Sequence, residues 1–101
     1  MDDVGRVALR GTDLSSRQSG AVYRRQVLAL LEGQERVILD LSEVFSVSGS
    51  FADELFGVLA ESLGENDFFS QIRLVNGRKS VLAAIARAVV TRLDGGSQIA
   101  A

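Results

Sequence analysis

The stretch from Val37 to Leu63, VILDLSEVFSVSGSFADELFGVLAESL, constrains the fold more than any other part of the chain. It begins with a short, nearly continuous apolar run that ends at Leu41, which is typical of a central strand buried on both faces. A serine-rich turn follows this run. From Phe51 onward apolar residues recur at helical spacing, and Gly64 is a suitable stop. The sequence therefore predicts a strand, a tight turn and a helix in succession.

Ser50 is the expected N-cap of this helix. It precedes the apolar-periodic segment, and Asp53 stands three positions on, in the manner of a capping box. Asp53 and Glu54 are then expected in the first helical turn, where carboxylates suit the positive end of the helix dipole.

The segment before this unit shows one more strand and one more helix. Residues 4–9 have a weak strand pattern that contains a glycine. Ser15 or Ser16 can cap a helix that ends near Leu31. Gly20 lies inside this helix at a cost of about 1 kcal/mol relative to alanine, which indicates either close packing or a weak point.

The C-terminal third repeats the alternation. Residues 65–67 are expected to be a polar link, residues 71–75 a strand, and residues 78–93 a helix with regular apolar spacing. The glycine pair after this helix is expected to terminate it. Residues 94–101, like residues 1–3, are therefore expected to be loose.

Alternating strands and helices imply crossover connections and hence an α/β fold. The expected architecture is a mixed or parallel sheet of about four strands with three helices packed on it. Only three strands are clear, so a fourth is expected as a hairpin between Met1 and Thr12. A chain of 101 residues with 47% apolar content forms a single domain with one modest core.

The composition argues against several classes of function. Cysteine and histidine are both absent, which removes disulfides, thiolate chemistry, the commonest metal ligand and the commonest general base. Lys79, the sole lysine, stands beside Ser80 at a helix start and is expected to be solvated rather than catalytic. We therefore expect no enzyme, no metal and no cofactor.

Charge and hydropathy give no reason to expect a nucleic acid or a membrane as partner. The formal net charge is -2, which is close to neutral. The sequence has no apolar run of membrane-spanning length and no secretion pattern at its N-terminus. A soluble cytoplasmic protein is the expectation.

The charges are distributed unevenly along the chain. Residues 40–67 contain seven acids and no base, whereas residues 73–92 contain five bases and no acid. One interpretation is that these are solvated faces of neighbouring helices that attract each other. The other is an acidic recognition surface around the second helix, which would steer a basic partner. On the first helix, Arg17 and Arg24 are seven residues apart and should project from nearly the same side.

Three serines, Ser46, Ser48 and Ser50, occupy every second position between the central strand and its helix. In one interpretation Ser50 caps the helix and the other two bond the backbone of the turn. In the other, one of them accepts a phosphoryl group. A phosphate there would strengthen an already negative surface beside Asp53 and Glu54.

VILDLSEV followed by SGSFADELFGVL resembles the central strand, loop and helix of STAS domains, the fold shared by sulfate-transporter tails and bacterial anti-sigma-factor antagonists. The pattern looks closest to the bacterial STAS-like family of unknown function. SSRQSG and IRLVNGRKSVLAAI resemble that family's first helix and its last strand and helix. The resemblance spans roughly Val7 to Val90 and is strongest from Ser50 to Leu55.

In anti-sigma-factor antagonists the corresponding loop reads Asp, Ser, Ser, Gly, and an ATP-binding anti-sigma kinase phosphorylates the first serine. Alignment by the strand and helix places Ser48 at the aspartate, Gly49 at the phosphoacceptor serine and Ser50 at the second serine. This chain therefore departs from the pattern at the phosphoacceptor position. Ser50 or Ser48 would replace it through a small shift of the loop.

The resemblance implies a regulatory module without catalytic activity that binds a protein partner, either an anti-sigma factor or a histidine-kinase-like ATPase. The contact would be made by residues 45–50 and the exposed side of the following helix. Two alternatives stay open: a sensor of a small ligand or nucleotide at the same loop, and a structural homodimer. The expected partner-binding residues are Phe45, Ser46, Ser48, Gly49, Ser50, Asp53 and Glu54.

Overall fold

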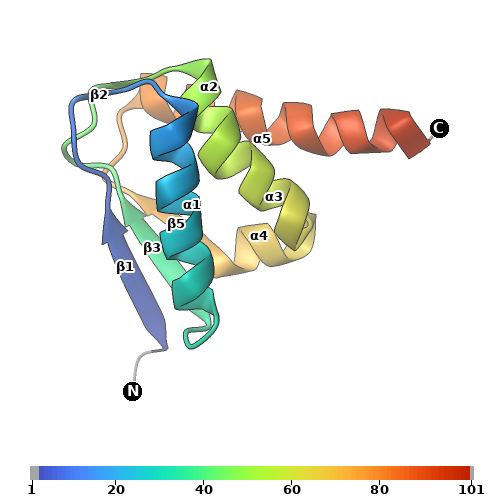
Figure 1. Ribbon diagram of the computed structural model, residues 1–101, viewed down its shortest axis with the longest axis horizontal. Helices are drawn as coiled ribbons and strands as arrows, with labels where there is room; N and C mark the ends of the chain where they lie inside the picture. Colours follow the sequence, from blue (N-terminus) through green and yellow to red (C-terminus); the bar gives the residue numbers. More distant parts are fainter. Residues whose placement is uncertain (1–2, 101) are drawn as a thin grey trace.

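The protein is an α/β domain in which parallel strands alternate with helices (Figure 1). The structure, a computed structural model, describes residues 3–100, with side chains as far as Gly95. The main sheet has three parallel strands in the order β1-β3-β5, and a separate small sheet pairs β2 with β4, also in parallel. The strands are β1 (Val4–Ala8), β2 (Asp13–Leu14), β3 (Arg36–Asp40), β4 (Ser46–Val47) and β5 (Ile72–Val75).

Helical segments connect and cover these strands. Three of them follow one another without a break and form a single rod, residues 49–63, which we call the central helix. The central helix packs between α1 on one side and α5 on the other (Figure 1). The segments are α1 (Arg17–Leu31), α2 (Gly49–Ala52), the π-helical turn η1 (Asp53–Gly57), α3 (Val58–Leu63), α4 (Glu65–Gln71) and α5 (Lys79–Ala100).

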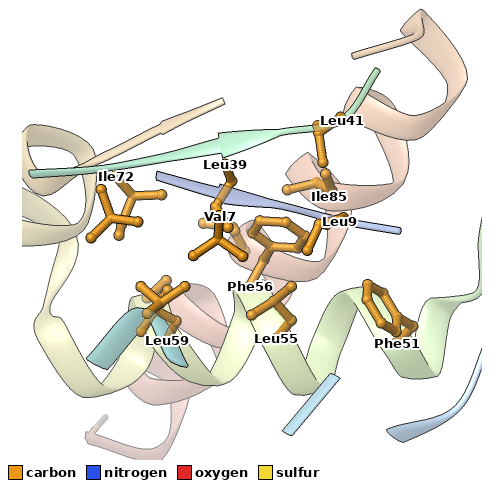
Figure 2. Close-up of a cluster of buried hydrophobic side chains, with 14 of the residues drawn as sticks. Val7, Leu9, Leu39, Leu41, Phe51, Leu55, Phe56, Leu59, Ile72 and Ile85 are labelled. Atoms are coloured by element: carbon orange, nitrogen blue, oxygen red, sulfur yellow. The ribbon is translucent and has the colours of Figure 1, made fainter. Parts of the chain in front are cut away.

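The core lies between one face of the main sheet and the central helix. Leu39, in the middle strand, and Phe56, in η1, are both fully buried. Burial of each such side chain stabilises the fold by about 1.5 to 3 kcal/mol, so this layer holds the sheet to the helices. Figure 2 shows side chains of the sheet facing side chains of the central helix: Val7, Leu39 and Ile72 from the sheet, and Leu55, Phe56 and Leu59 from the helix.

Two glycines set the distance between the central helix and its neighbours. A Cβ atom on Gly20 of α1 would lie 3.1 Å from the carbonyl oxygen of Phe51. A Cβ atom on Gly57 of η1 would lie 2.8 Å from Cγ of Arg92 and 3.2 Å from the carbonyl oxygen of Ala88 in α5. Close packing at Gly20, one of the two interpretations of the sequence, is therefore confirmed.

The predicted α/β class and the parallel sheet are confirmed, but the hairpin expected between Met1 and Thr12 is wrong. Within the described part of that segment there is only β1. The additional strand pairing is made by Asp13–Leu14, which aligns with Ser46–Val47 outside the main sheet. Residues 1 and 2, expected to be loose, lie outside the described residues.

The polar link predicted for residues 65–67 is also wrong, because these residues begin α4. Gly64, with φ of 87°, ends α3 as predicted, and its carbonyl oxygen then accepts a hydrogen bond from the amide of Phe68 at 2.9 Å. Phe68 is buried and ties the short helix to the core. A short helix with a single buried residue has too little apolar periodicity to be recognised from the sequence.

The stop predicted at the glycine pair 95–96 is wrong as well, since α5 continues to Ala100. A glycine ends a helix when it adopts a left-handed conformation. Gly95 is not among the described residues with positive φ, so it stays within the helix. No helix in the part of the chain that the structure describes is long and apolar enough to cross a bilayer.

Candidate functional site

Residues 45–50, which we call the docking loop, lie beyond the carboxyl end of the central strand. The chain leaves β3 through Leu41, whose amide donates to the carbonyl oxygen of Val75 at 2.9 Å. The amides of Phe45 and Ser46 both donate to the carbonyl oxygen of Thr12, at 2.7 and 2.9 Å. Because Val44 between these anchors is buried, the loop is fastened to the body of the protein.

Phe45 is the most conspicuous side chain of the docking loop. It is 57% exposed, although it follows the fully buried Val44 directly. The guanidinium carbon of Arg78 lies 4.5 Å from the centroid of its ring, which is a cation–π contact. The contact orients the ring and leaves much of its surface available to a partner.

The three serines of the loop have different surroundings. Ser48 is the N-cap of the central helix: its hydroxyl accepts a hydrogen bond from the amide of Phe51 at 3.0 Å and donates one to the carbonyl oxygen of Ser15 at 2.7 Å. The hydroxyl of Ser46 donates to Asp13 at 2.6 Å. The predicted cap at Ser50 is therefore wrong, because the helix begins two residues earlier.

Ser50 lies exposed in the first turn of the central helix. Within the described residues its hydroxyl makes no hydrogen bond, in contrast to those of Ser46 and Ser48. Gly49 beside it is also exposed, and a Cβ atom there would meet nothing within 4 Å. The surface around Ser50 is consequently open.

Asp53 and Glu54 do not lie in the first turn of the helix, as the sequence led us to expect, but in η1, where they face arginines. Arg92 of α5 binds Asp53 through two hydrogen bonds of 2.8 Å. Arg17 of α1 contacts Asp53 at 2.9 Å and Glu54 at 3.2 Å, and Arg24 contacts Glu54 at 2.7 Å. The side chains of Asp53 and Glu54 are only 21% and 22% exposed, respectively.

These ion pairs hold both carboxyl groups in the charged form. The hydrogen bond from Arg92 lowers the pKa of Asp53 to about 2, and the hydrogen bond from Arg24 lowers the pKa of Glu54 below its usual value. The shared contact with Glu54 confirms that Arg17 and Arg24 project from the same side of α1.

The acid-rich and base-rich segments of the sequence attract each other, as one of the two interpretations held. Arg92, at the end of the base-rich segment, also contacts Glu61 of α3 at 3.1 Å. Because Asp53 and Glu54 are already occupied, the central helix presents few free carboxylates to a partner. The side of this helix that carries Asp53 and Glu54 faces α1 and α5.

A groove with a volume of about 330 Å³ runs between the docking loop and α5. Arg87 on its α5 side has no carboxylate partner among the described residues. The sequence interpretation did not include α5 in the site, although the run of bases without acids in residues 73–92 is a signal of it. The groove is lined by Val47, Gly49, Asp53, Ala84, Arg87, Ala88 and Thr91.

A protein family matches more than half of the chain. The family described as STAS-like domain of unknown function (DUF4325) matches residues 19–82, which is more than half of the chain. The matched part contains the docking loop and the whole central helix. No curated protein and no solved structure matches the chain significantly.

Proposed function

Since this chain belongs to the family of STAS-like domains of unknown function, we propose that it is a non-catalytic regulatory module that binds a protein partner through its docking loop. The observation that carries this proposal is the exposed ring of Phe45, held by Arg78 on a loop that is otherwise well anchored. Aromatic side chains on rigid supports are the usual anchors of protein interfaces.

The proposed contact surface is smaller than the sequence suggested. It consists of Phe45, Ser46, Gly49 and Ser50, together with the groove beside α5 that contains Arg87. Ser48, Asp53 and Glu54 support this surface from within, because their polar atoms are bonded inside the protein. The resemblance to anti-sigma-factor antagonists favours an anti-sigma factor or a histidine-kinase-like ATPase as the partner, and hence a cytoplasmic location.

Phosphorylation of Ser50 is the proposed switch. The Ser50 hydroxyl is exposed and makes no hydrogen bond within the described residues, so a phosphate there would change the contact surface and leave the fold intact. Phosphorylation of Ser48 would remove the cap of the central helix. Of the two candidate phosphoacceptors, Ser50 therefore fits a reversible switch better, although Gly49 occupies the position that carries the phosphate in the antagonists.

A pull-down from native cell extract tests the proposal, with the wild type, Ser50→Glu and Ser62→Glu as baits. Ser62 is an exposed serine of α3 outside the docking loop, so Ser62→Glu is a control for the added charge. We expect the wild type and Ser62→Glu to recover an ATP-binding kinase-like protein, and Ser50→Glu to recover about tenfold less. Equal recovery of the partner by all three baits, with equal melting temperatures, would refute the proposal that the docking loop binds the partner.

A further inference from the structure

The main sheet has one covered face and one open face. Its strands follow the order β1-β3-β5, so successive right-handed crossovers place α1 and the later helices on the same side. The burial pattern agrees: Val7, Val37 and Leu39 are buried, whereas Arg6 and Arg36, which alternate with them, are exposed. Parallel sheets are almost always covered on both faces, so the open face lacks the cover that this kind of sheet normally has.

The open face has an apolar centre. Ile38 of the middle strand lies in register between Arg6 on β1 and Arg73 on β5. Val75 follows on the same face, two residues beyond Arg73. Ile38 and Val75 are half-buried, and neither belongs to the hydrophobic core on the other side of the sheet. A partner that covers them gains apolar burial that the fold itself does not supply.

Positive charge surrounds this centre. Among the residues of the three strands, Arg6, Arg36 and Arg73 share the face with one carboxylate, that of Asp40. Asp40 already binds Arg6 at 2.9 Å and the side-chain amide of Asn76 at 3.1 Å. Arg36 and Arg73 have no carboxylate partner among the described residues.

We propose that the open face binds an acidic amphipathic helix of a protein partner, with its apolar stripe on Ile38 and its carboxylates on Arg36 and Arg73. Helices are what normally cover a parallel sheet, and carboxylates complement the unpaired arginines. A symmetric pair of copies would oppose arginine with arginine, which disfavours a second copy of this chain. The three strands carry no aromatic side chain on which a nucleic acid base would stack. This site is separate from the docking loop and does not depend on its function.

Fluorescence anisotropy with a labelled synthetic peptide tests this proposal. The probe is an amphipathic helix of roughly five turns with leucines on one side and glutamates flanking them. We expect it to bind the wild type, and the double variant Arg36→Glu/Arg73→Glu to bind it at least about tenfold more weakly. Arg25→Glu/Lys79→Glu makes the same charge change on exposed residues of α1 and α5 and should retain the wild-type affinity. Ile38→Gln should weaken binding without any change of charge.

If the charge-reversed variant does not fold, the neutral double variant Arg36→Gln/Arg73→Gln replaces it in the binding measurement. Equal affinities of the sheet variant and the α1/α5 control would overturn the proposal, as would the absence of binding up to about 1 mM peptide. Phosphatidylserine vesicles and a single-stranded oligonucleotide are tested in parallel. If either binds in a manner that depends on Arg36 and Arg73 while the peptide does not, the occupant is a lipid surface or a nucleic acid and the proposal is wrong.

Discussion

Two serines of the docking loop, two positions apart, have opposite surroundings. Ser48 precedes the central helix with extended backbone angles, and its hydroxyl satisfies the amide of Phe51. Ser50 stands inside the first turn and is exposed. The same side chain therefore stabilises the fold at one position and is available for modification at the other.

Replacing each serine by alanine distinguishes the stabilising role of Ser48 from the exposed position of Ser50. We expect Ser48→Ala to lower the free energy of unfolding by about 1 kcal/mol, because it removes the cap of the helix on which the core is built. Ser50→Ala should change it by less than about 0.5 kcal/mol, since no hydrogen bond of the described residues is lost. Urea denaturation followed by circular dichroism measures both variants. A larger loss at Ser50 than at Ser48 would contradict the assigned cap.

At the scale of elements, the central helix depends on close contact with α5. The contact is closest at Gly57, where the backbone and the stem of Arg92 leave no room for a side chain. The same stem carries the guanidinium that binds Asp53, so the packing of the two helices and their ion pair rest on the same residues.

Gly57→Ala tests this contact. The new methyl group would meet Arg92 and Asp53 at 2.8 Å and the Ala88 carbonyl oxygen at 3.2 Å, so the helices must move apart. We expect a loss of about 1 to 3 kcal/mol in the free energy of unfolding, against the small gain that alanine normally brings inside a helix. Gly33→Ala, where a Cβ atom meets nothing within 4 Å, should stay within about 0.5 kcal/mol of the wild type. A neutral Gly57→Ala would show that α5 is not tightly packed.

The sequence predicts the elements that have strong local signals. The helix after Ser16, the central strand, the last strand and the stop at Gly64 appear as expected. The start of the central helix was missed by two residues, because Ser48 and Ser50 both suit a cap and only the tertiary fold selects between them. The arginines around Asp53 and Glu54 come from helices far away in the sequence, so periodicity alone does not reveal them.

At the scale of the whole molecule, the separated charges of the sequence become one cluster. Arg17 and Arg24 approach from α1 and Arg92 from α5, and all three meet the carboxylates of η1. The cluster joins α1 and α5 to the central helix. Asp40 makes a second, smaller cluster with Arg6 and Asn76, which links two strands of the sheet. Both clusters require ionised carboxylates.

Stability should therefore fall in acid. The hydrogen bonds from Arg92 to Asp53 and from Asn76 to Asp40 lower the pKa of each carboxyl group, to about 2 for Asp53. In the unfolded chain an aspartate has a pKa of about 3.9. The folded form then binds protons less readily than the unfolded form. The contribution of each group is fully present above about pH 5 and is lost as the pH falls from about 4 towards 2.

Urea denaturation of the wild type and Asp53→Asn from about pH 7 to pH 3 measures this contribution. At neutral pH we expect the variant to be less stable by about 1 to 2 kcal/mol, because Arg92 and Arg17 each lose one of their two charged partners. The difference should shrink as the pH approaches 3, since the unfolded wild type then binds a proton at Asp53 that the folded form does not bind. Glu65→Gln changes an exposed carboxylate that has no ion pair among the described residues, and it should leave the pH profile unchanged. Parallel profiles of the wild type and Asp53→Asn would mean that the cluster around η1 does not stabilise the folded protein through its charge.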